Sequence, residues 1–338
     1  MSMIVVENVT KYYGAHAAVR DLTFRIEEGE CVGFLGLNGA GKTTTLKLLS
    51  CLLLPTSGRA SIRGLDVEAA PHEIRKFIGF LPDTPPLYDE MLVSDYLRFA
   101  GKLRKMTSSA VSKRLPEVVR EAGLEDVAGE PIATLSHGYR QRVGIAQAII
   151  HQPALLILDE PINGLDPVQI VEMRELIRGL RGKHTILLST HILSEIEQTC
   201  DRILMLNQGR VAAQGTEHEL LEKMSRGSTF VVEVRAGDGQ PGPEGLTSAL
   251  KAIDGVTGVV LEPHASDAIV RAQVQAERDV RGAAAKALVG GGFELVELSR
   301  RATGLEKIFV ELSRGQGPVA GAPTPTASTA TESSEGAS

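Results

Sequence analysis

The sequence predicts an α/β fold in which buried parallel strands alternate with helices. Near-continuous apolar runs occupy residues 31–35, 77–81 and 154–158, as is typical of strands that are covered on both faces of a sheet. Turn-forming or acidic residues follow each run, and segments with helical periodicity lie farther along the chain. The 338 residues suggest about two domains, and the pattern starts again after residue 226.

A glycine-rich segment follows the first apolar run and organises the first domain. Residues 36–43 have the sequence GLNGAGKT, and a helix is expected to begin near Lys42. In that context the backbone N–H groups can surround an anion, and the start of the helix adds a partial positive charge. Lys42 would reach the β- and γ-phosphates of a nucleotide, and the Thr43 hydroxyl would ligate Mg²⁺. A plain glycine turn is the alternative, but the complete pattern favours a phosphate-binding loop.

Composition excludes several classes of protein. The net charge of −6 gives no support for a nucleic-acid-binding surface, so we expect no nucleic-acid partner. The longest apolar runs are too short to span a membrane, and the first residues lack the pattern of a secretory signal. Cys31, Cys51 and Cys200 are scattered in apolar surroundings, which favours buried thiols in a reducing compartment. A cytoplasmic protein is therefore expected.

The N-terminal segment predicts half-buried strands at residues 3–9 and 19–26, because apolar and polar residues alternate there. Tyr13, on the loop between them, could stack on a purine base; packing against a sheet edge is the alternative. A further strand is expected at 59–62 and a short helix within 66–76.

A helical insertion is predicted after the strand at residues 77–81. Asp83 ends that strand, and amphipathic helices are expected at 93–104 and 109–122. Ser136 is a plausible N-cap for a helix that continues through 143–150. Taken alone, this last segment predicts only a capped helix.

Acidic side chains follow the most apolar strand, at residues 154–158. Asp159 and Glu160 come directly after it, at the edge where open α/β sheets bind ligands. Their side chains are expected to alternate across the strand end, which would allow different roles. His191 follows the next strand, 185–188, and should lie at the same edge. The alternatives are a solvated strand end for the acids and a structural role for the histidine.

The remaining elements complete the two domains. Residues 163–167 form a turn before a helix at 168–180, and a hairpin joins strands at 203–206 and 211–213. The second domain predicts strand, helix, strand, strand, helix and strand, an order that resembles a ferredoxin-like module. These elements are expected at residues 229–235, 246–253, 256–261, 268–274, 277–288 and 293–298, with a last helix at 304–312.

The pieces up to about residue 224 together resemble the nucleotide-binding subunit of an ATP-binding cassette (ABC) transporter. The resemblance implies a P-loop NTPase of the ABC type at residues 1–226, with a helical subdomain at about 84–150. A small α+β ferredoxin-like domain would occupy 227–314, and a disordered tail 315–338 would follow because it is rich in Pro, Ala, Ser, Thr and Gly.

The resemblance also implies a role for each matching residue. Asp159 would associate with Mg²⁺, Glu160 would polarise the attacking water, and His191 would sense the γ-phosphate. Tyr13 would stack on adenine, and Asp166 would lie at the seam of a dimer. Ser136 and Gly138 belong to the signature motif, and the phosphate loop comprises Asn38, Gly39, Ala40, Gly41, Lys42, Thr43 and Thr44.

The sequence departs from the family pattern at two places. Residues 135–139 are LSHGY where the family usually has LSGGQ, so His137 replaces a glycine and Tyr139 a glutamine. Asp83 replaces a longer glutamine or glutamate, which places its reach to Mg²⁺ in question. The segments around Asp83 and Ser136 resemble the branch that contains drug-exporter and gliding-motility-type cassettes.

The resemblance implies an ATP-binding and ATP-hydrolysing subunit that powers a separate membrane permease, in the direction of export. Each ATP would lie between the phosphate loop of one cassette and the signature of another, so a two-fold dimer is expected. Such a subunit, with ATP and Mg²⁺ as cofactors, would be peripheral on the cytoplasmic face of the membrane. A non-transport ABC ATPase is one alternative. A nucleotide sensor without turnover is another, against which Glu160 and His191 argue.

The permease is expected to dock on residues 84–104. Pro85 and Pro86 would stiffen this segment, which also carries exposed apolar side chains, and such a surface suits a short helix from a partner. These apolar residues are Leu87, Tyr88, Met91 and Leu92. The alternative is that Leu87, Tyr88 and Leu92 cap the helical subdomain.

Overall fold

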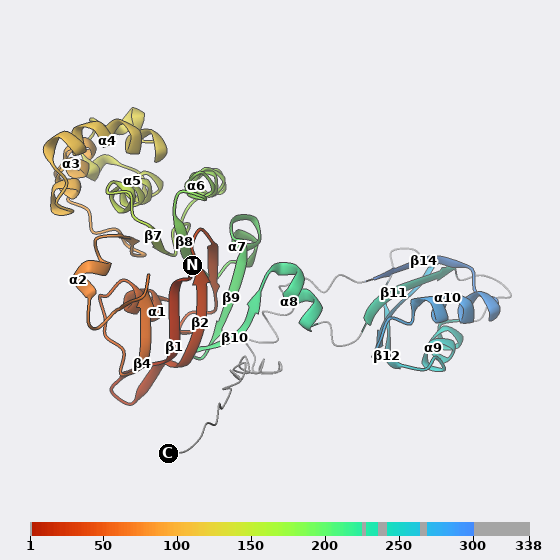
Figure 1. The fold of residues 1–338 in the computed structure, drawn as a ribbon. Helices are drawn as coiled ribbons and strands as arrows, with labels where there is room; N and C mark the ends of the chain where they lie inside the picture. Colours follow the sequence, from red (N-terminus) through yellow and green to blue (C-terminus); the bar gives the residue numbers. More distant parts are fainter. Residues whose placement is uncertain (1, 225–227, 236–241, 264–268, 301–338) are drawn as a thin grey trace, which may run out of the picture.

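The computed structural model describes residues 2–224, 228–235, 242–263 and 269–300. Its N-terminal part combines two sheets and a helical insertion (Figure 1). Within the described residues, no helix combines the length and the apolar character needed to span a membrane. The predicted helix at 304–312 and the predicted tail at 315–338 both lie outside the described residues.

The first sheet is antiparallel, in the order β2-β1-β4-β5. Its alternating buried and exposed residues agree with the predicted half-buried strands. Phe24 packs edge-on against Phe34 of the second sheet, with ring centroids 5.4 Å apart. The strands are β1 (Ser2–Tyr13), β2 (His16–Glu27), β4 (Ser57–Ile62) and β5 (Leu65–Asp66).

The predicted lengths of β1 and β2 are wrong, because both strands extend beyond the residues in which apolar and polar side chains alternate. Tyr13 is therefore the last residue of β1 and not part of a loop. Its side chain is half exposed, with Lys11 Nζ 5.8 Å from the centre of the ring.

The second sheet has six strands in the order β10-β9-β3-β8-β7-β6. All neighbouring strands are parallel except the terminal hairpin of β9 and β10, as the apolar runs predicted. Every residue of β3, β7 and β8 is buried. The strands are β3 (Cys31–Leu35), β6 (Ile78–Leu81), β7 (Leu155–Asp159), β8 (Thr185–Thr190), β9 (Arg202–Asn207) and β10 (Arg210–Gly215).

Helices connect the parallel strands and cover the sheet. The phosphate loop leads directly into α1, and α6 connects β7 to β8. Helices α7 and α8 are short and were not expected from the sequence. These helices are α1 (Lys42–Leu49), α2 (Pro71–Ile74), α6 (Pro167–Leu180), α7 (Leu193–Thr199) and α8 (Glu217–Met224).

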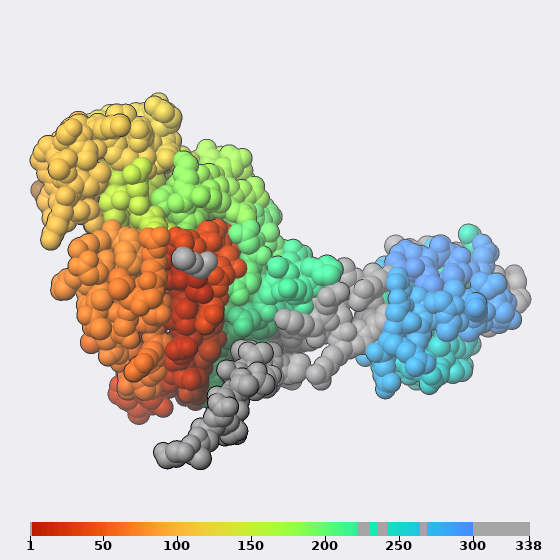
Figure 2. Space-filling model, in the orientation of Figure 1, coloured from red at the N-terminus to blue at the C-terminus, as the bar shows by residue number. Residues whose placement is uncertain are grey.

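The helical insertion forms a lobe beside the sheets (Figure 2). It contains α3 (Val93–Leu103), α4 (Ser108–Glu121) and α5 (His137–Ile149), with the 3₁₀ turns η1 (Glu125–Val127) and η2 (Ile132–Thr134). Its buried residues join the same apolar cluster as one face of the six-stranded sheet. Helix α5 begins directly after Ser136, which is its N-cap as predicted, so the predicted signature motif lies on the first turn of a helix.

The C-terminal part is a separate α+β unit with its own apolar core. Its antiparallel sheet has the order β12-β13-β11-β14, and Phe230, Leu250 and Leu288 are fully buried in the core. The predicted alternation of strands and helices is present, although α10 begins later than expected. The elements are β11 (Ser228–Arg235), α9 (Pro243–Lys251), β12 (Val256–Glu262), β13 (Ile269–Ala276), α10 (Arg281–Gly290) and β14 (Leu295–Arg300).

Candidate active site

The phosphate loop connects β3 to α1, and its backbone requires glycine. Gly39 and Gly41 have φ values of +83° and +100°, which disfavour residues with a side chain. A Cβ atom on Gly41 would lie 2.6 Å from the Ala18 carbonyl oxygen, and one on Gly36 would lie 2.7 Å from that of Leu206. Neighbouring strands therefore hold the loop closely from two sides.

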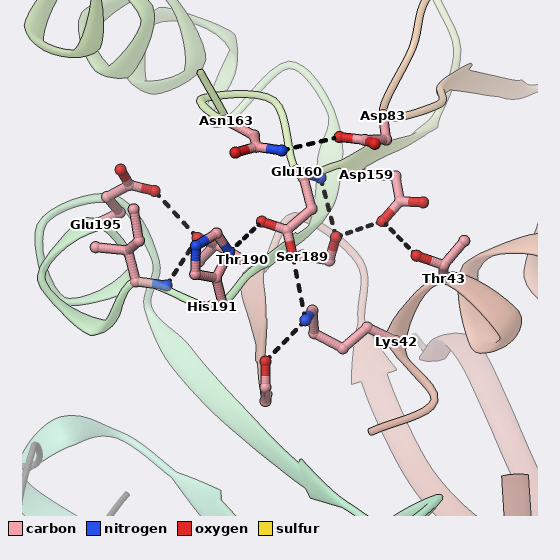
Figure 3. Close-up of polar contacts among 12 residues, drawn as sticks. Lys42, Thr43, Asp83, Asp159, Glu160, Asn163, Ser189, Thr190, His191 and Glu195 are labelled. Carbon is pink, nitrogen blue, oxygen red and sulfur yellow. Dashed lines mark hydrogen bonds and ion pairs between the residues drawn. The ribbon is translucent and has the colours of Figure 1, made fainter. Parts of the chain in front are cut away.

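Lys42 is the first residue of α1, and its side chain is buried at 6% exposure. Its ammonium donates to the Gly36 carbonyl oxygen at 2.7 Å and forms an ion pair with Glu160 at 3.1 Å. The charge therefore lies between the phosphate loop and the acidic end of β7 (Figure 3). A cation in this position can bind a phosphate oxygen.

Asp159 ends β7 and is buried against two hydroxyl groups. Its Oδ1 accepts hydrogen bonds from Ser189 Oγ at 2.6 Å and from Thr43 Oγ1 at 3.2 Å. Burial raises the pKa of Asp159; the two hydroxyl groups oppose this shift, while the charges of Glu160 and Asp83 add to it. A nearby divalent cation would favour the ionised form of this carboxyl.

Glu160 follows Asp159, and its backbone has a φ of +49°. The expected alternation along a strand is wrong here, because β7 ends at Asp159 and a left-handed residue turns the chain. The Glu160 carboxylate consequently bridges Lys42 and His191, whose Nδ1 lies 3.0 Å from Glu160 Oε2. One carboxylate thus joins the ends of three elements: α1, β7 and β8.

His191 lies directly after β8 and is partly exposed beside this carboxylate. The preceding residue, Thr190, donates to the buried carboxylate of Glu195 at 3.1 Å and accepts from the Ile192 amide at 3.0 Å. Burial raises the pKa of Glu195, and the hydrogen bond from Thr190 opposes the shift. These contacts fix the short turn that presents the imidazole to Glu160.

A cavity of about 580 Å³ lies over these residues. Asp83 reaches its rim, where Asn163 Nδ2 donates to Asp83 Oδ1 at 3.4 Å. The lining residues are His16, Ala18, Leu37, Asn38, Gly39, Ala40, Gly41, Lys42, Thr43, Thr44, Asp83, Glu160, Asn163 and His191. The cavity brings together the predicted phosphate loop, Asp83, Glu160 and His191, and Asp159 lies directly beneath them.

The other predicted site residues are not in the lining of this cavity. Ser136 caps α5 by accepting from the Tyr139 amide at 3.4 Å, and Asp166 caps α6 by accepting from two backbone amides. Gly138 packs so closely on Gln169 that a Cβ atom would lie 2.8 Å from its side chain. Tyr13 also lies outside the lining. The structure therefore divides the predicted site into two groups of residues.

Sequence reasoning missed Ser189 and Asn163. Ser189 lies within β8, beyond the predicted end of that strand, and Asn163 was assigned only to a turn. A polar residue at the carboxyl end of a buried strand was the available signal for Ser189. His137, which replaces the glycine of the signature, places Nε2 3.1 Å from the Asn163 carbonyl oxygen.

Oxygen atoms dominate the possible metal ligands in the cavity. Across the part of the chain that the structure describes, no cluster of three or more His, Cys, Asp or Glu side chains could hold a metal ion. A cation at Thr43 and Asp159 would therefore need further oxygen ligands from a bound molecule or from water.

Comparisons with known proteins identify the family. The family model described as ABC transporter matches residues 19–163. Bacitracin transport ATP-binding protein BcrA of Bacillus licheniformis is 33% identical over 324 residues, which cover 93% of this chain and 98% of that protein. Nod factor export ATP-binding protein I of Ralstonia nicotianae is 37% identical over 221 residues, which cover 65% and 68% of the two chains.

Solved structures agree with this assignment. The ATP-binding subunit of an ABC transporter is 36% identical with a TM-score of 0.60, covering 65% of this chain and 92% of that one. A dimeric ATP-binding cassette in a post-hydrolysis state, bound to ADP and Pi, is 27% identical with a TM-score of 0.59 and covers 63% and 98%. This chain therefore belongs to the ABC transporter ATP-binding subunits of the drug-exporter type, which hydrolyse ATP to power a separate membrane permease.

Proposed function

We propose that the cavity over the phosphate loop binds MgATP and that Glu160 activates the attacking water. The observation that carries this proposal is the bridge that Glu160 forms between Lys42 and His191. Lys42 and the loop amides, with Asn38 to Thr44, bind the phosphates. Phosphoryl transfer depends mainly on such positioning and on charge stabilisation.

Glu160 and His191 have complementary parts in this proposal. The carboxylate accepts a hydrogen bond from the water and holds it in line with the γ-phosphate. An imidazole protonated on both nitrogens donates from Nδ1 to Glu160 and from Nε2 to a phosphate oxygen at the same time. The position of His191 can thus respond to the presence of the γ-phosphate.

Magnesium fits the residues at the bottom of the cavity. Thr43 and Asp159 present a hydroxyl and a carboxylate, and Mg²⁺ prefers one or two such groups together with phosphate oxygens. Both hydrogen bonds to the Asp159 carboxylate go to Oδ1, so Oδ2 can face the cation. Thr43 and Asp159 would hold the cation, which would supply positive charge to neutralise the phosphates. We propose Asp83 as a further contributor from the rim.

Ser136, Gly138 and Asp166 act across a dimer in this proposal. They lie outside the cavity of their own chain, and the first two belong to a capped helix start that favours an anion. The similar cassette solved with ADP and Pi is a dimer. We assign Tyr13, which is half exposed at the end of β1, to stacking on adenine.

We propose export as the direction of transport, because similar proteins are named for bacitracin transport and Nod factor export. The subunit would then act at the cytoplasmic face of the membrane. Its permease would dock on a groove of about 510 Å³ lined by Leu87, Tyr88, Asp89, Glu90, Met91 and Phe99. Asp89 of this groove pairs with Arg140 at 2.6 Å, so Glu90 is the acidic group that favours a basic partner helix.

The side chains that line this groove differ in how far they are exposed to solvent. Tyr88 is 56% exposed, with its ring 5.6 Å from that of Phe99, whereas Leu87 and Met91 are partly buried against the core. Leu87 and Met91 line the groove while packing in part against the core, and we propose the more exposed Tyr88 as the main contact for the permease.

Docking can be tested with Tyr88→Lys. This variant should lose most co-purification with the permease from detergent-solubilised membranes and keep its basal ATPase rate. Leu103→Lys is the matched control, because Leu103 is 65% exposed at the other end of α3 and does not line the groove. Equal permease recovery by Tyr88→Lys and wild type would place the docking site elsewhere.

We propose that residues 1–226 form the cassette, with its helical subdomain at 84–150, and that residues 227–314 form an accessory domain. The order β12-β13-β11-β14 with two helices supports a ferredoxin-like topology for this domain. Its separate apolar core supports a regulatory or dimer-supporting role apart from the chemistry. The composition of residues 315–338 supports a disordered tail.

A further inference from the structure

Ser189 contacts both acidic residues of the site through one hydroxyl group. Its Oγ donates to Asp159 Oδ1 at 2.6 Å and accepts from the Glu160 backbone amide at 3.0 Å (Figure 3). The residue is fully buried, at 0% exposure, on the strand next to β7. The buried hydroxyl group therefore acts as a donor to Asp159 and as an acceptor for the next residue, Glu160.

These two bonds constrain different properties of the acids. The bond to Oδ1 fixes the rotation of the Asp159 carboxylate, together with Thr43, so that Oδ2 keeps one direction. The bond from the Glu160 amide supports a backbone with φ of +49°, which persists only where the surroundings specify it. A second bond joins the same amide to the Ser189 carbonyl oxygen at 3.2 Å.

The neighbouring hydroxyl residue provides an internal comparison. Thr190 is also buried at the end of β8, yet its Oγ1 bonds Glu195 and the Ile192 amide. It therefore supports the turn that carries His191, and its hydroxyl bonds Glu195 and Ile192 where that of Ser189 bonds Asp159. Consecutive side chains of a strand point to opposite faces, which separates the two roles.

We propose that Ser189 is a positioning residue that sets Asp159 for Mg²⁺ and Glu160 for water, while Thr190 positions only His191. This inference rests on the proposed binding of MgATP. It assigns to Ser189 an effect on the magnesium dependence of nucleotide binding that Thr190 does not share.

Substitution of Ser189 by alanine should reduce the gain in nucleotide affinity that Mg²⁺ provides. The affinity for the nucleotide without Mg²⁺ should change less. Removing a hydrogen-bond partner of a metal ligand commonly costs about 10- to 100-fold in metal affinity or activity. We expect a loss of about that size in the affinity that Mg²⁺ adds, and in turnover. Binding without Mg²⁺ should stay near wild type, because Lys42 and the loop are unchanged.

The experiment uses calorimetric titration of the full chain with a non-hydrolysable ATP analogue, first in EDTA and then in Mg²⁺. Ser189→Ala is compared with Thr190→Val, which should keep the full response to Mg²⁺ while lowering turnover. Ser189→Thr retains the hydroxyl and should recover most of the response. Thermal unfolding without nucleotide reports on folding, and Ser189→Cys, similar in size but a weak donor, replaces Ser189→Ala if the latter does not fold.

The outcomes separate the inference from the proposed function. If wild type gains affinity with Mg²⁺ and a folded Ser189→Ala or Ser189→Cys gains the same amount, the inference is overturned. The same holds if Thr190→Val loses the response equally. If wild type itself gains nothing from Mg²⁺, the magnesium assignment fails, and the inference fails with it.

Discussion

Two histidines flank strand β8, and the structure gives them different environments. His184 precedes the strand, is buried, and donates from Nδ1 to the Pro153 carbonyl oxygen at 2.6 Å; burial lowers its pKa. His191 follows the strand, is 41% exposed, and contacts the Glu160 carboxylate. The same residue type is structural at the amino end of a parallel strand and belongs to the candidate site at the carboxyl end.

This contrast extends along both edges of the six-stranded sheet. Several polar groups at the amino edge bond to the backbone, as His151 does with the Ile78 carbonyl oxygen at 3.0 Å. At the carboxyl edge, Lys42 pairs with Glu160 and Ser189 bonds to Asp159, and Lys42 and Glu160 line a cavity. Partners that are side chains can exchange for a ligand, whereas backbone partners hold the fold.

The largest expected effect is at the carboxyl edge. Glu160→Gln should lower turnover by about 10²- to 10⁴-fold, because the water loses its general base. ATP binding should persist, since the side chain keeps its size and Lys42 remains available. Phosphate release and calorimetric binding measure the two properties.

The control for Glu160→Gln lies at the other end of β8. His184→Asn keeps a donor near the position of Nδ1, so a folded variant should hydrolyse ATP near the wild-type rate. Hydrolysis by Glu160→Gln at the wild-type rate would remove Glu160 from its role. If a well-folded His184→Asn variant hydrolysed ATP slowly, His184 would not be purely structural, and the difference between the two edges of the sheet would not hold.

The second prediction concerns Ser136, which does not line the cavity of its own chain. Ser136→Arg and Lys42→Ala should each be inactive alone, and mixed chains should recover about one active site in each mixed dimer. The reason is that one chain then contributes Lys42 and the other Ser136. ATPase activity of the mixture, with subunit exchange verified separately, is the measurement. Absence of recovery despite exchange would mean that Ser136 and Lys42 act within the same chain.

A smaller effect is expected at the rim of the cavity. Asp83→Ala should raise the Mg²⁺ concentration needed for half-maximal ATPase activity by roughly tenfold, because an oxygen ligand or its water partner is lost. The Asp83→Asn variant removes the negative charge but keeps an oxygen that can accept the hydrogen bond from Asn163. It therefore separates the effect of the charge from that of the hydrogen bond. An unchanged Mg²⁺ titration for Asp83→Ala would reduce Asp83 to a turn residue.

The last prediction concerns stability at the amino edge. Burial lowers the pKa of His151 to about 4, from the usual 6.5, so the unfolded chain binds a proton that the folded chain excludes. The resulting stability is complete above pH 6.5 and is lost as the pH falls toward 4. Between pH 7.5 and pH 5 the loss should be about 2 kcal/mol.

Urea unfolding of wild type and His151→Gln at these two pH values measures this contribution. Glutamine can donate to the Ile78 carbonyl oxygen without titrating, so the variant should lose less stability on acidification. His184 contributes in the same direction in both proteins, so the difference between them reports on His151 together with its interaction with His184. If the two proteins lose equal stability, His151 is not the titrating group.

The sequence was most informative where a local pattern determines the structure. The runs at 31–35 and 154–158 predicted buried parallel strands, and the glycine pattern with Lys42 predicted the phosphate loop. The last residues of β1 were missed because the register to β2 shifts between Val9 and Lys11 and again between Lys11 and Tyr12, which breaks the alternation there. The alternation of apolar and polar residues therefore identifies a strand only as far as the next shift in its register.

The site was only partly predictable for a similar reason. Asp159, Glu160 and His191 follow strands, and topology alone brings them to one edge. The orientation of Glu160 depends on a positive φ that an acidic residue does not indicate, and Asn163 meets Asp83 across 80 residues of sequence. Long-range partners of this kind have no local pattern in a single sequence.

The position of β3 in the sheet has a consequence for the order in which the chain can fold during synthesis. Its two neighbours, β8 and β9, come from residues 185–190 and 202–207, so β3 leaves the ribosome long before either partner exists. At about 5–20 residues per second, this delay lasts on the order of ten seconds or more. The helices of the insertion make local contacts and can form within that time, whereas the proposed ATP cavity gains its last lining residue, His191, only after β8 has emerged.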